Sequence, residues 1–125
     1  MRIVPYKSFG DVQLGESEDA VVKLLGAPSR RVINKAGEVE LDYQSLVVRL
    51  QPPHGVLEIT ARPEDVCLGE DRFSRHDLPQ QLQKRDPDAR EICGFMVSFE
   101  YGVAVDTDTV NDGWISVFVK GRWDD

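Results

Sequence analysis

Two long stretches of the chain alternate apolar and polar side chains, and this alternation limits the fold more than any other feature. The first stretch runs from residue 30 to residue 61, and the second from residue 95 to residue 119. In the first, Val39, Leu41 and Tyr43 alternate with acidic residues, which is typical of a strand with one covered and one wet face. Turn residues divide this stretch into four segments. It therefore predicts an antiparallel meander of four strands.

The second stretch predicts further strands of the same kind. Its alternate apolar residues are expected to share one face; they are Phe95, Val97, Phe99, Tyr101, Val103 and Val105. The final strand, with Ile115 and Val117 on one face, also carries Trp114 and Phe118 on the other, so it should lie inside the sheet. A turn is expected at 111–113. Residues 2–6 predict a short edge strand, because Pro5 lacks a backbone donor.

Residues 14–28 contain the clearest helix signal. Ser17 is a favourable N-cap residue, and the acidic residues that follow it suit the positive end of the helix dipole. Val21, Leu24 and Leu25 form one apolar stripe at helical spacing. Gly26 provides a conformation that ends helices. A helix is therefore expected here.

A second, shorter helix is expected within residues 76–86, with Leu78 and Leu82 facing inward. Ser74 or Asp77 could cap it. Residues 63–74, which separate it from the meander, hold four acidic residues and are predicted to form a turn-rich connector.

These elements predict one α+β domain spanning residues 1–125. We expect a single antiparallel sheet of about seven strands in the order β-α-ββββ-α-ββ, with two helices packed on one face. A chain of 125 residues can bury a core without cross-links, so Cys67 and Cys93 are expected to be reduced thiols. Each half reads as a helix followed by a meander, which suggests an internal pseudo-repeat.

The acidic charge of the chain lies in its second half. The formal net charge is −7; residues 63–125 hold 14 acidic and 7 basic side chains, whereas residues 1–62 hold 8 of each. Such a surface repels nucleic acid and anionic membranes. It attracts a basic protein partner, although the same charge can simply keep a small protein in solution. The first residues lack the pattern of a secretory signal, so a cytoplasmic location is expected.

No motif for catalysis, a metal or a cofactor stands out. Asp106, Asp108 and Asp112 partly match a calcium loop, but valines occupy two of the ligand positions. Cys67 and Cys93 lie among apolar neighbours, which disfavour a reactive thiolate. We therefore expect a protein that is not an enzyme and that needs no cofactor.

Aromatic and acidic residues near the C-terminal end are the best candidates for a binding surface. Tryptophan is a favoured anchor at protein interfaces, and acids around it would complement a basic partner. Trp114 also suits a core position, and Trp123 suits either a surface or a sheet edge. The candidate partner-binding residues are Asp106, Asp108, Asp112, Trp114, Trp123, Glu70 and Asp71.

Residues 14–28, with the capped acidic helix start, the paired leucines and the Gly-Ala-Pro ending, resemble the helix signature of SmpA/OmlA (BamE-like) and β-lactamase-inhibitor-protein-like folds. The order of short segments along the chain is similar to that of small cytoplasmic bacterial proteins encoded beside polymorphic toxin genes. Those segments are Ile3-Val4-Pro5, Leu41-Asp42-Tyr43, Leu57-Glu58-Ile59, Gly102-Val103-Ala104 and Val119-Lys120-Gly121-Arg122-Trp123.

This resemblance implies an immunity protein, an inhibitor that neutralises a cognate toxin effector domain by surface complementarity. Two alternatives stay open. The chain could be a non-catalytic homodimeric assembly module that pairs through its final strand. It could also be a small-ligand-binding domain or an enzyme, with a pocket around Cys67 and His76.

Overall fold

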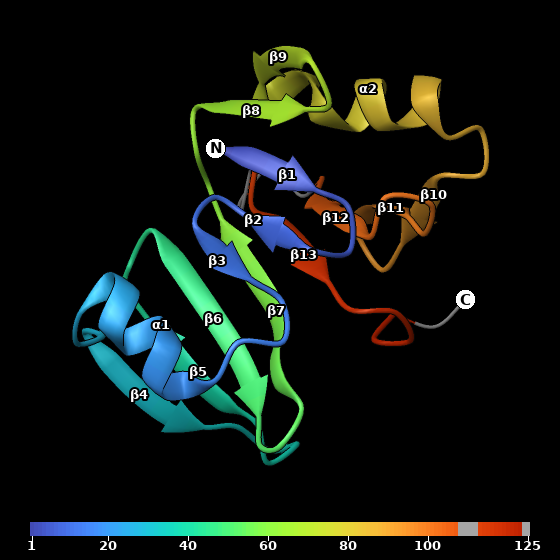
Figure 1. Cartoon of the computed structure of the whole chain (residues 1–125). Helices are drawn as coiled ribbons and strands as arrows, with labels where there is room; N and C mark the ends of the chain where they lie inside the picture. Colours follow the sequence, from blue (N-terminus) through green and yellow to red (C-terminus); the bar gives the residue numbers. More distant parts are fainter. Residues whose placement is uncertain (108–112, 124–125) are drawn as a thin grey trace.

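The computed structural model describes residues 1–107 and 113–123, which form two β-sheets and two α-helices (Figure 1). The larger sheet has eight strands in the order β10-β11-β12-β13-β7-β6-β5-β4, and the smaller has five in the order β3-β2-β1-β8-β9. The helices are α1 (Glu18–Leu25), the 3₁₀ turn η1 (Arg75–Asp77) and α2 (Leu78–Arg85). The strands are β1 (Arg2–Val4), β2 (Ser8–Phe9), β3 (Val12–Gln13), β4 (Arg30–Ile33), β5 (Val39–Asp42), β6 (Leu46–Gln51), β7 (Gly55–Ala61), β8 (Asp65–Leu68), β9 (Asp71–Ser74), β10 (Arg90–Ile92), β11 (Phe95–Ser98), β12 (Val103–Asp106) and β13 (Ile115–Phe118).

Helix α1 has the predicted boundaries, but one residue of its predicted stripe is exposed. The Ser17 hydroxyl accepts a hydrogen bond from the Ala20 amide at 3.1 Å, and Gly26, with φ of 86°, ends the helix. Val21 is fully buried, whereas Leu24 is 48% exposed. The helix packs through the side that carries Val21 and Leu25, and Leu24 points about 100° away from Leu25 around the axis.

Helix α2 confirms the second prediction, with Leu78 and Leu82 both fully buried. Ser74 caps the preceding 3₁₀ turn by accepting from the His76 amide, and Asp77 makes no side-chain cap. Within the described residues, no helix has the length and apolar character needed to cross a bilayer.

The predicted four-stranded meander is confirmed as β4 to β7, paired in sequence order. Strand β13 lies between β12 and β7, and all four of its residues are buried. A second antiparallel meander runs from β10 to β13, so each half of the chain has a helix followed by four paired strands. The two meanders meet where β7 pairs with β13.

The prediction of one seven-stranded sheet is wrong, because two segments form a separate sheet. Strand β1 is not an edge strand: it lies between β2 and β8 and runs parallel to β8. The predicted connector 63–74 contains the hairpin of β8 and β9. Val66 and Leu68 alternate toward the interior and are buried. Gly69, with φ of 65°, permits the two-residue turn between the strands.

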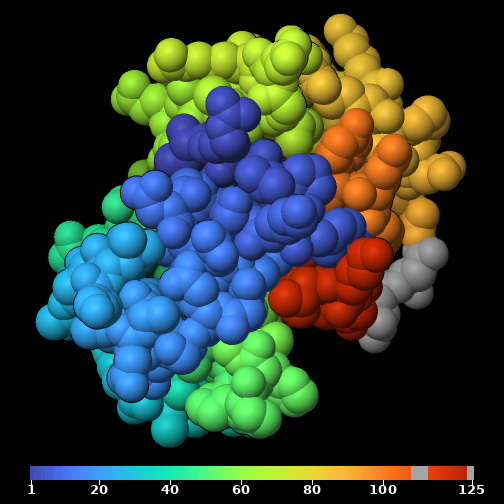
Figure 2. Space-filling model, in the orientation of Figure 1, coloured from blue at the N-terminus to red at the C-terminus, as the bar shows by residue number. Residues whose placement is uncertain are grey.

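The main core lies between the two sheets. One apolar cluster includes residues of both sheets and both helices. In Figure 1, α1 and strands β1 to β3 lie in front of the larger sheet, and Figure 2 shows N-terminal residues in blue filling the middle of that side. The layer that covers the larger sheet is therefore the smaller sheet together with the helices, rather than two helices alone.

The predicted shared face of residues 95–105 is also wrong. Val103 and Val105 lie in the main core, whereas Val97 is in register with Ala104 and belongs to a second, smaller apolar cluster. Residues on paired strands that lie directly opposite each other share a face of the sheet. The hairpin between β11 and β12 therefore places Val97 on the face away from the main core, here called the second face.

Candidate functional site

Three rows of side chains cross the second face of the larger sheet. In the first row, Glu40, Arg49 and Glu58 lie directly opposite one another on β5, β6 and β7. In the second row, Thr60 of β7 lies opposite Ser116 of β13. Such cross-strand neighbours interact through their side chains. The two hydroxyl groups of the second row are 2.8 Å apart, at the line where the two meanders meet.

The third row holds aromatic residues and one acid. Phe95 lies opposite Asp106, and the Asp106 amide donates to the Trp114 carbonyl at 2.9 Å. Arg62 follows Ala61, the partner of Ile115, and its guanidinium lies 5.3 Å from the centre of the Trp114 ring. That distance is in the range of a cation–π contact.

A hollow of about 230 Å³ lies between these rows. It exists because Thr60 and Ser116 are small, whereas the residues in the rows on either side of them are large. Trp123, from the segment after β13, adds a further wall. The residues that line the hollow are Arg49, Glu58, Thr60, Phe95, Asp106, Trp114, Ser116 and Trp123.

Ionic contacts hold the first wall of the hollow in place. Arg49 donates from Nε to Glu40 at 3.0 Å and from Nη1 to Glu58 at 3.1 Å. Arg122 donates to both oxygens of Glu38, at 2.6 and 3.0 Å, and lies 3.4 Å from Glu58. These side chains are less than one-third exposed. Multiple charge-assisted bonds of this kind fix side-chain positions.

The bidentate Arg122 contact also changes the ionisation of its partner. Hydrogen bonds from Arg122 are the largest cause that lowers the pKa of Glu38, from 4.5 to about 2, against the opposing effect of burial. The same hydrogen bonds raise the pKa of Arg122. The pair therefore stays ionised at neutral pH and connects the segment after β13 to the first meander.

The aromatic wall is also packed against neighbouring rings. The rings of Phe95 and Trp123 make an edge-to-face contact with centres 5.2 Å apart. The Trp123 ring lies 6.0 Å from that of Phe118, and its indole nitrogen is 3.4 Å from Glu58 Oε1. Aromatic pairs with this geometry are favourable beyond their buried area. Trp123 is thus held while remaining partly exposed.

The structure brings three of the seven predicted binding residues together. Asp106, Trp114 and Trp123 all line the hollow. Asp106 is only 9% exposed, and Trp114 is half-buried on the second face rather than in the main core. Asp108 and Asp112, with most of the predicted turn at 111–113, lie outside the described residues.

Glu70 and Asp71 are exposed but lie elsewhere. They belong to the hairpin of β8 and β9 in the smaller sheet, and they are not among the residues that line the hollow. Asp71 forms an ion pair with Arg85 of α2. Among the five candidates that the structure describes, Glu70 and Asp71 therefore lie apart from the three that line the hollow.

Several residues of the hollow could not be found from the sequence. Arg49, Glu58 and Thr60 alternate with apolar residues and are indistinguishable from an ordinary wet face. Ser116 is a small polar residue in an otherwise apolar final strand, and this interruption is the sequence feature that could indicate the hollow. Its meaning depends on the pairing of β7 with β13, which joins residues 56 positions apart.

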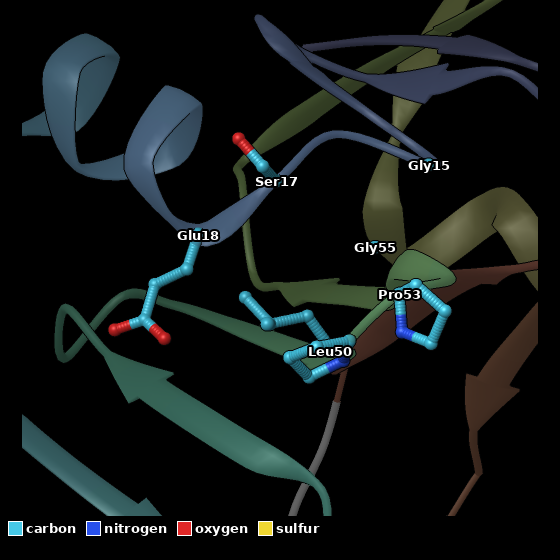
Figure 3. Close-up of a pocket in the computed structure, with 7 residues that line it drawn as sticks. Gly15, Ser17, Glu18, Leu50, Pro53 and Gly55 are labelled. Atoms are coloured by element: carbon cyan, nitrogen blue, oxygen red, sulfur yellow. The ribbon is translucent and has the colours of Figure 1, made fainter.

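A second hollow, of about 140 Å³, lies where the segment before α1 meets the turn between β6 and β7 (Figure 3). Its walls are mostly backbone and apolar carbon, from residues such as Leu50 and Pro53. Its one carboxylate, Glu18, is paired with Arg31 at 2.7 Å. Beside it, the Gly15 amide donates to the Val56 carbonyl at 2.9 Å, and the Val56 amide donates to the Glu16 carbonyl at 2.8 Å. This hollow is a packing feature of the α1 attachment.

The predicted thiols are placed differently from each other: Cys67 is half-buried in β8, and Cys93 is exposed. Within residues 1–107 and 113–123, no group of three or more His, Cys, Asp or Glu side chains is placed to hold a metal ion.

Comparisons of the chain with protein-family models, curated proteins and solved structures give no match.

Proposed function

We propose that this protein is a non-enzymatic, cytoplasmic inhibitor of the immunity type, which binds a cognate toxin effector domain through the second face of its larger sheet. The observation that carries this proposal is the hollow lined by Trp114, Trp123 and Asp106. Partly exposed tryptophans are favoured anchors in protein-binding hot spots, and the carboxylate beside them would complement a basic partner.

The rigidity of this face supports a binding role. Glu58 is held by Arg49, Arg122 and Trp123 at once. A surface that is already ordered loses little side-chain entropy when a partner binds. The volume of about 230 Å³ is below the roughly 300–1,000 Å³ typical of small-molecule pockets. This favours a protein partner that inserts a side chain over a free ligand.

A growth-rescue experiment tests the proposal. The product of each gene adjacent to the one encoding this chain is expressed in a test bacterium, alone and together with this protein. One product should arrest growth alone, and co-expression should restore growth. Trp114→Ala with Trp123→Ala should abolish the rescue, because the anchors on the second face are removed.

Ile33→Ser is the matched control. Ile33 is 65% exposed, and it lies in register with the core residue Val39, on the face opposite to the hollow. This variant should rescue growth like the original protein, and all proteins should be checked for equal soluble amounts. The proposal is wrong if no neighbouring product is toxic, or if the double tryptophan variant rescues growth fully.

The homodimeric alternative now rests on a different strand. Both sides of β13 are paired within the chain, so the final strand cannot pair with a second copy in the described arrangement. Strand β4 is at the edge of the larger sheet and carries the exposed Ile33. Sedimentation at several protein concentrations, with Ile33→Ser as the comparison, distinguishes a dimer through β4 from a monomer.

A further inference from the structure

We infer that Tyr6, in the turn between β1 and β2, is a positioning residue for the second face: through the ring of Phe118 it sets the orientation of Trp123. This inference rests on the proposed function and extends it to a residue that does not line the hollow. Its evidence is the backbone conformation of Tyr6 and the contacts of its side chain.

The backbone of Tyr6 is unusual for an aromatic residue. The Lys7 amide donates to the Val4 carbonyl at 2.9 Å, so Tyr6 is the third residue of a tight turn. Its φ is 59°, in the left-handed region that glycine or asparagine ordinarily occupies at this turn position. Such conformations persist where the surroundings impose them, and they gather at functional sites. The turn alone therefore does not explain a tyrosine here, and its side chain is the place to look.

That side chain contacts the turn between β11 and β12 and the segment after β13. The Tyr6 hydroxyl donates to the Phe99 carbonyl. The ring lies against Gly102, where a Cβ would come within 2.8 Å of a ring carbon. The Lys120 ammonium lies 5.4 Å from the centre of the ring, in the range of a cation–π contact. Figure 2 shows the N-terminal residues in blue beside the segment after β13 in red.

The same ring is linked to the wall of the hollow through one intermediate residue. It meets the ring of Phe118 edge to face, with centres 6.2 Å apart and planes at 89°. Phe118 is buried, and its ring centre lies 6.0 Å from that of Trp123. All three residues belong to the second apolar cluster, whose other members come from residues 92–104. Phe118 therefore packs against both Tyr6 and the partly exposed Trp123.

The orientation of Trp123 matters because this residue is a proposed anchor. An anchor that packing already holds in place loses less side-chain entropy on binding, and supporting residues keep such groups in their productive orientation. Without the Tyr6 ring, Phe118 would gain room to turn, and Trp123 would lose one of its supports. Trp114 has a neighbour of its own, because Arg62 lies 5.3 Å from its ring, so its orientation should not depend on Tyr6.

The first test follows the indole N–H signals of Trp123 and Trp114 by NMR in the full chain labelled with ¹⁵N. Tyr6→Gly removes the ring and suits the positive φ, so the turn itself should be kept. In this variant the Trp123 signal should move and the Trp114 signal should stay in place. Should Tyr6→Gly fail to fold, Tyr6→Leu, which keeps apolar bulk in the cluster, should give the same result.

Two conservative variants separate the ring from the hydroxyl. Tyr6→Phe keeps the contact with Phe118, so it should move the Trp123 signal less than Tyr6→Gly does. Tyr43→Phe is the matched control, because the Tyr43 hydroxyl also donates to a backbone carbonyl, that of Gly26, at 2.8 Å. Since that contact lies beside α1, its loss should move neither tryptophan signal.

The second test measures, by calorimetry, binding of the toxin domain that the growth-rescue experiment identifies. Tyr6→Gly should raise the dissociation constant about 5-fold or more, the smallest change typical of a disturbed anchor. Tyr6→Phe and Tyr43→Phe should bind nearly as tightly as the original protein. A tyrosine that only stabilised the fold would leave the affinity of the folded variant unchanged.

The inference is overturned if a folded variant without the Tyr6 ring leaves the Trp123 signal in place, or if it moves the Trp114 signal as far. It is also overturned if Tyr6→Gly binds the toxin domain as tightly as the original. In these cases the proposed function stands as long as growth rescue depends on Trp114 and Trp123. If rescue does not depend on them, the proposed function falls and the inference falls with it.

Discussion

Protonation of Glu38 should weaken the fold measurably, because the hydrogen bonds from Arg122 favour the ionised form of Glu38. The pKa of Glu38 is lowered from 4.5 to about 2, chiefly by hydrogen bonds from Arg122. Each pH unit is worth about 1.4 kcal/mol, so the ionised pair stabilises the folded state by about 3 kcal/mol at neutral pH. Because the folded-state pKa is lowered, this stability is fully present above about pH 4.5 and is lost as the pH falls toward 2.

Glu38→Gln removes the titrating group and should remove this pH dependence. The variant should be less stable than the original protein by about 3 kcal/mol at pH 7, by about 2 kcal/mol at pH 3.5 and by about 1 kcal/mol at pH 2.5. Urea unfolding at each pH, followed by tryptophan fluorescence, gives the two free energies of unfolding. Comparing the two proteins at the same pH cancels the titration of the other carboxylates.

Glu91→Gln is the control for this experiment, because Glu91 is exposed on β10. Its free energy of unfolding should stay within about 0.5 kcal/mol of the original at every pH. The reasoning is refuted if the free energies of unfolding of Glu38→Gln and the original protein differ by the same amount at pH 7 and at pH 2.5. It is also refuted if they differ by less than about 0.5 kcal/mol at pH 7.

Two further predictions concern the fold. Gly55→Ala should destabilise the protein by at least about 2 kcal/mol more than Gly37→Ala. Both glycines have φ near 80°, so the backbone strain of the two substitutions is similar. A Cβ at Gly55 would lie 2.3 Å from the Gly15 carbonyl oxygen, whereas a Cβ at Gly37 would meet nothing within 4 Å. Thermal unfolding of the two variants checks this, and equal losses would contradict it. Val21→Ala should lower the free energy of unfolding by about 2 kcal/mol because Val21 is fully buried, while Leu24→Ala should lower it by less than about 0.5 kcal/mol. A larger decrease for Leu24→Ala than for Val21→Ala in urea unfolding would show that α1 packs through a different side.

Local signals predicted the elements that depend on neighbouring residues. The start and end of α1 follow from Ser17 and Gly26, which act within one turn of the helix. The meander of β4 to β7 follows from the alternation of adjacent segments and the turns between them. In each case the interacting residues are close along the chain.

Pairings between distant residues could not be predicted in the same way. Strand β1 pairs with β8, joining Ile3 to Leu68, and neither short segment shows which strand it will meet. This pairing turns a predicted edge strand into a central one and separates a second sheet. The alternation shows that one face of a strand is covered, but the covering element depends on distant contacts.

The residues of the candidate site likewise fall into those that local signals predict and those whose role depends on distant pairing. Trp114, Trp123 and Asp106 stood out by residue type and local acidity, and they do meet in space. Glu70 and Asp71 shared the acidity but fold into the other sheet. Thr60 and Ser116, which form the floor, are ordinary residues whose importance comes from the pairing of β7 with β13.

The most direct test of whether the second face binds the partner is amide hydrogen exchange. It is measured on the protein alone and on its complex with the toxin domain that the growth-rescue experiment identifies. Binding there should slow amide exchange in the described segment 113–123 and in β7, beside the hollow. Slowing confined to α1, β4 or the hairpin of β8 and β9, with no change at Trp114 and Trp123, would contradict this interface.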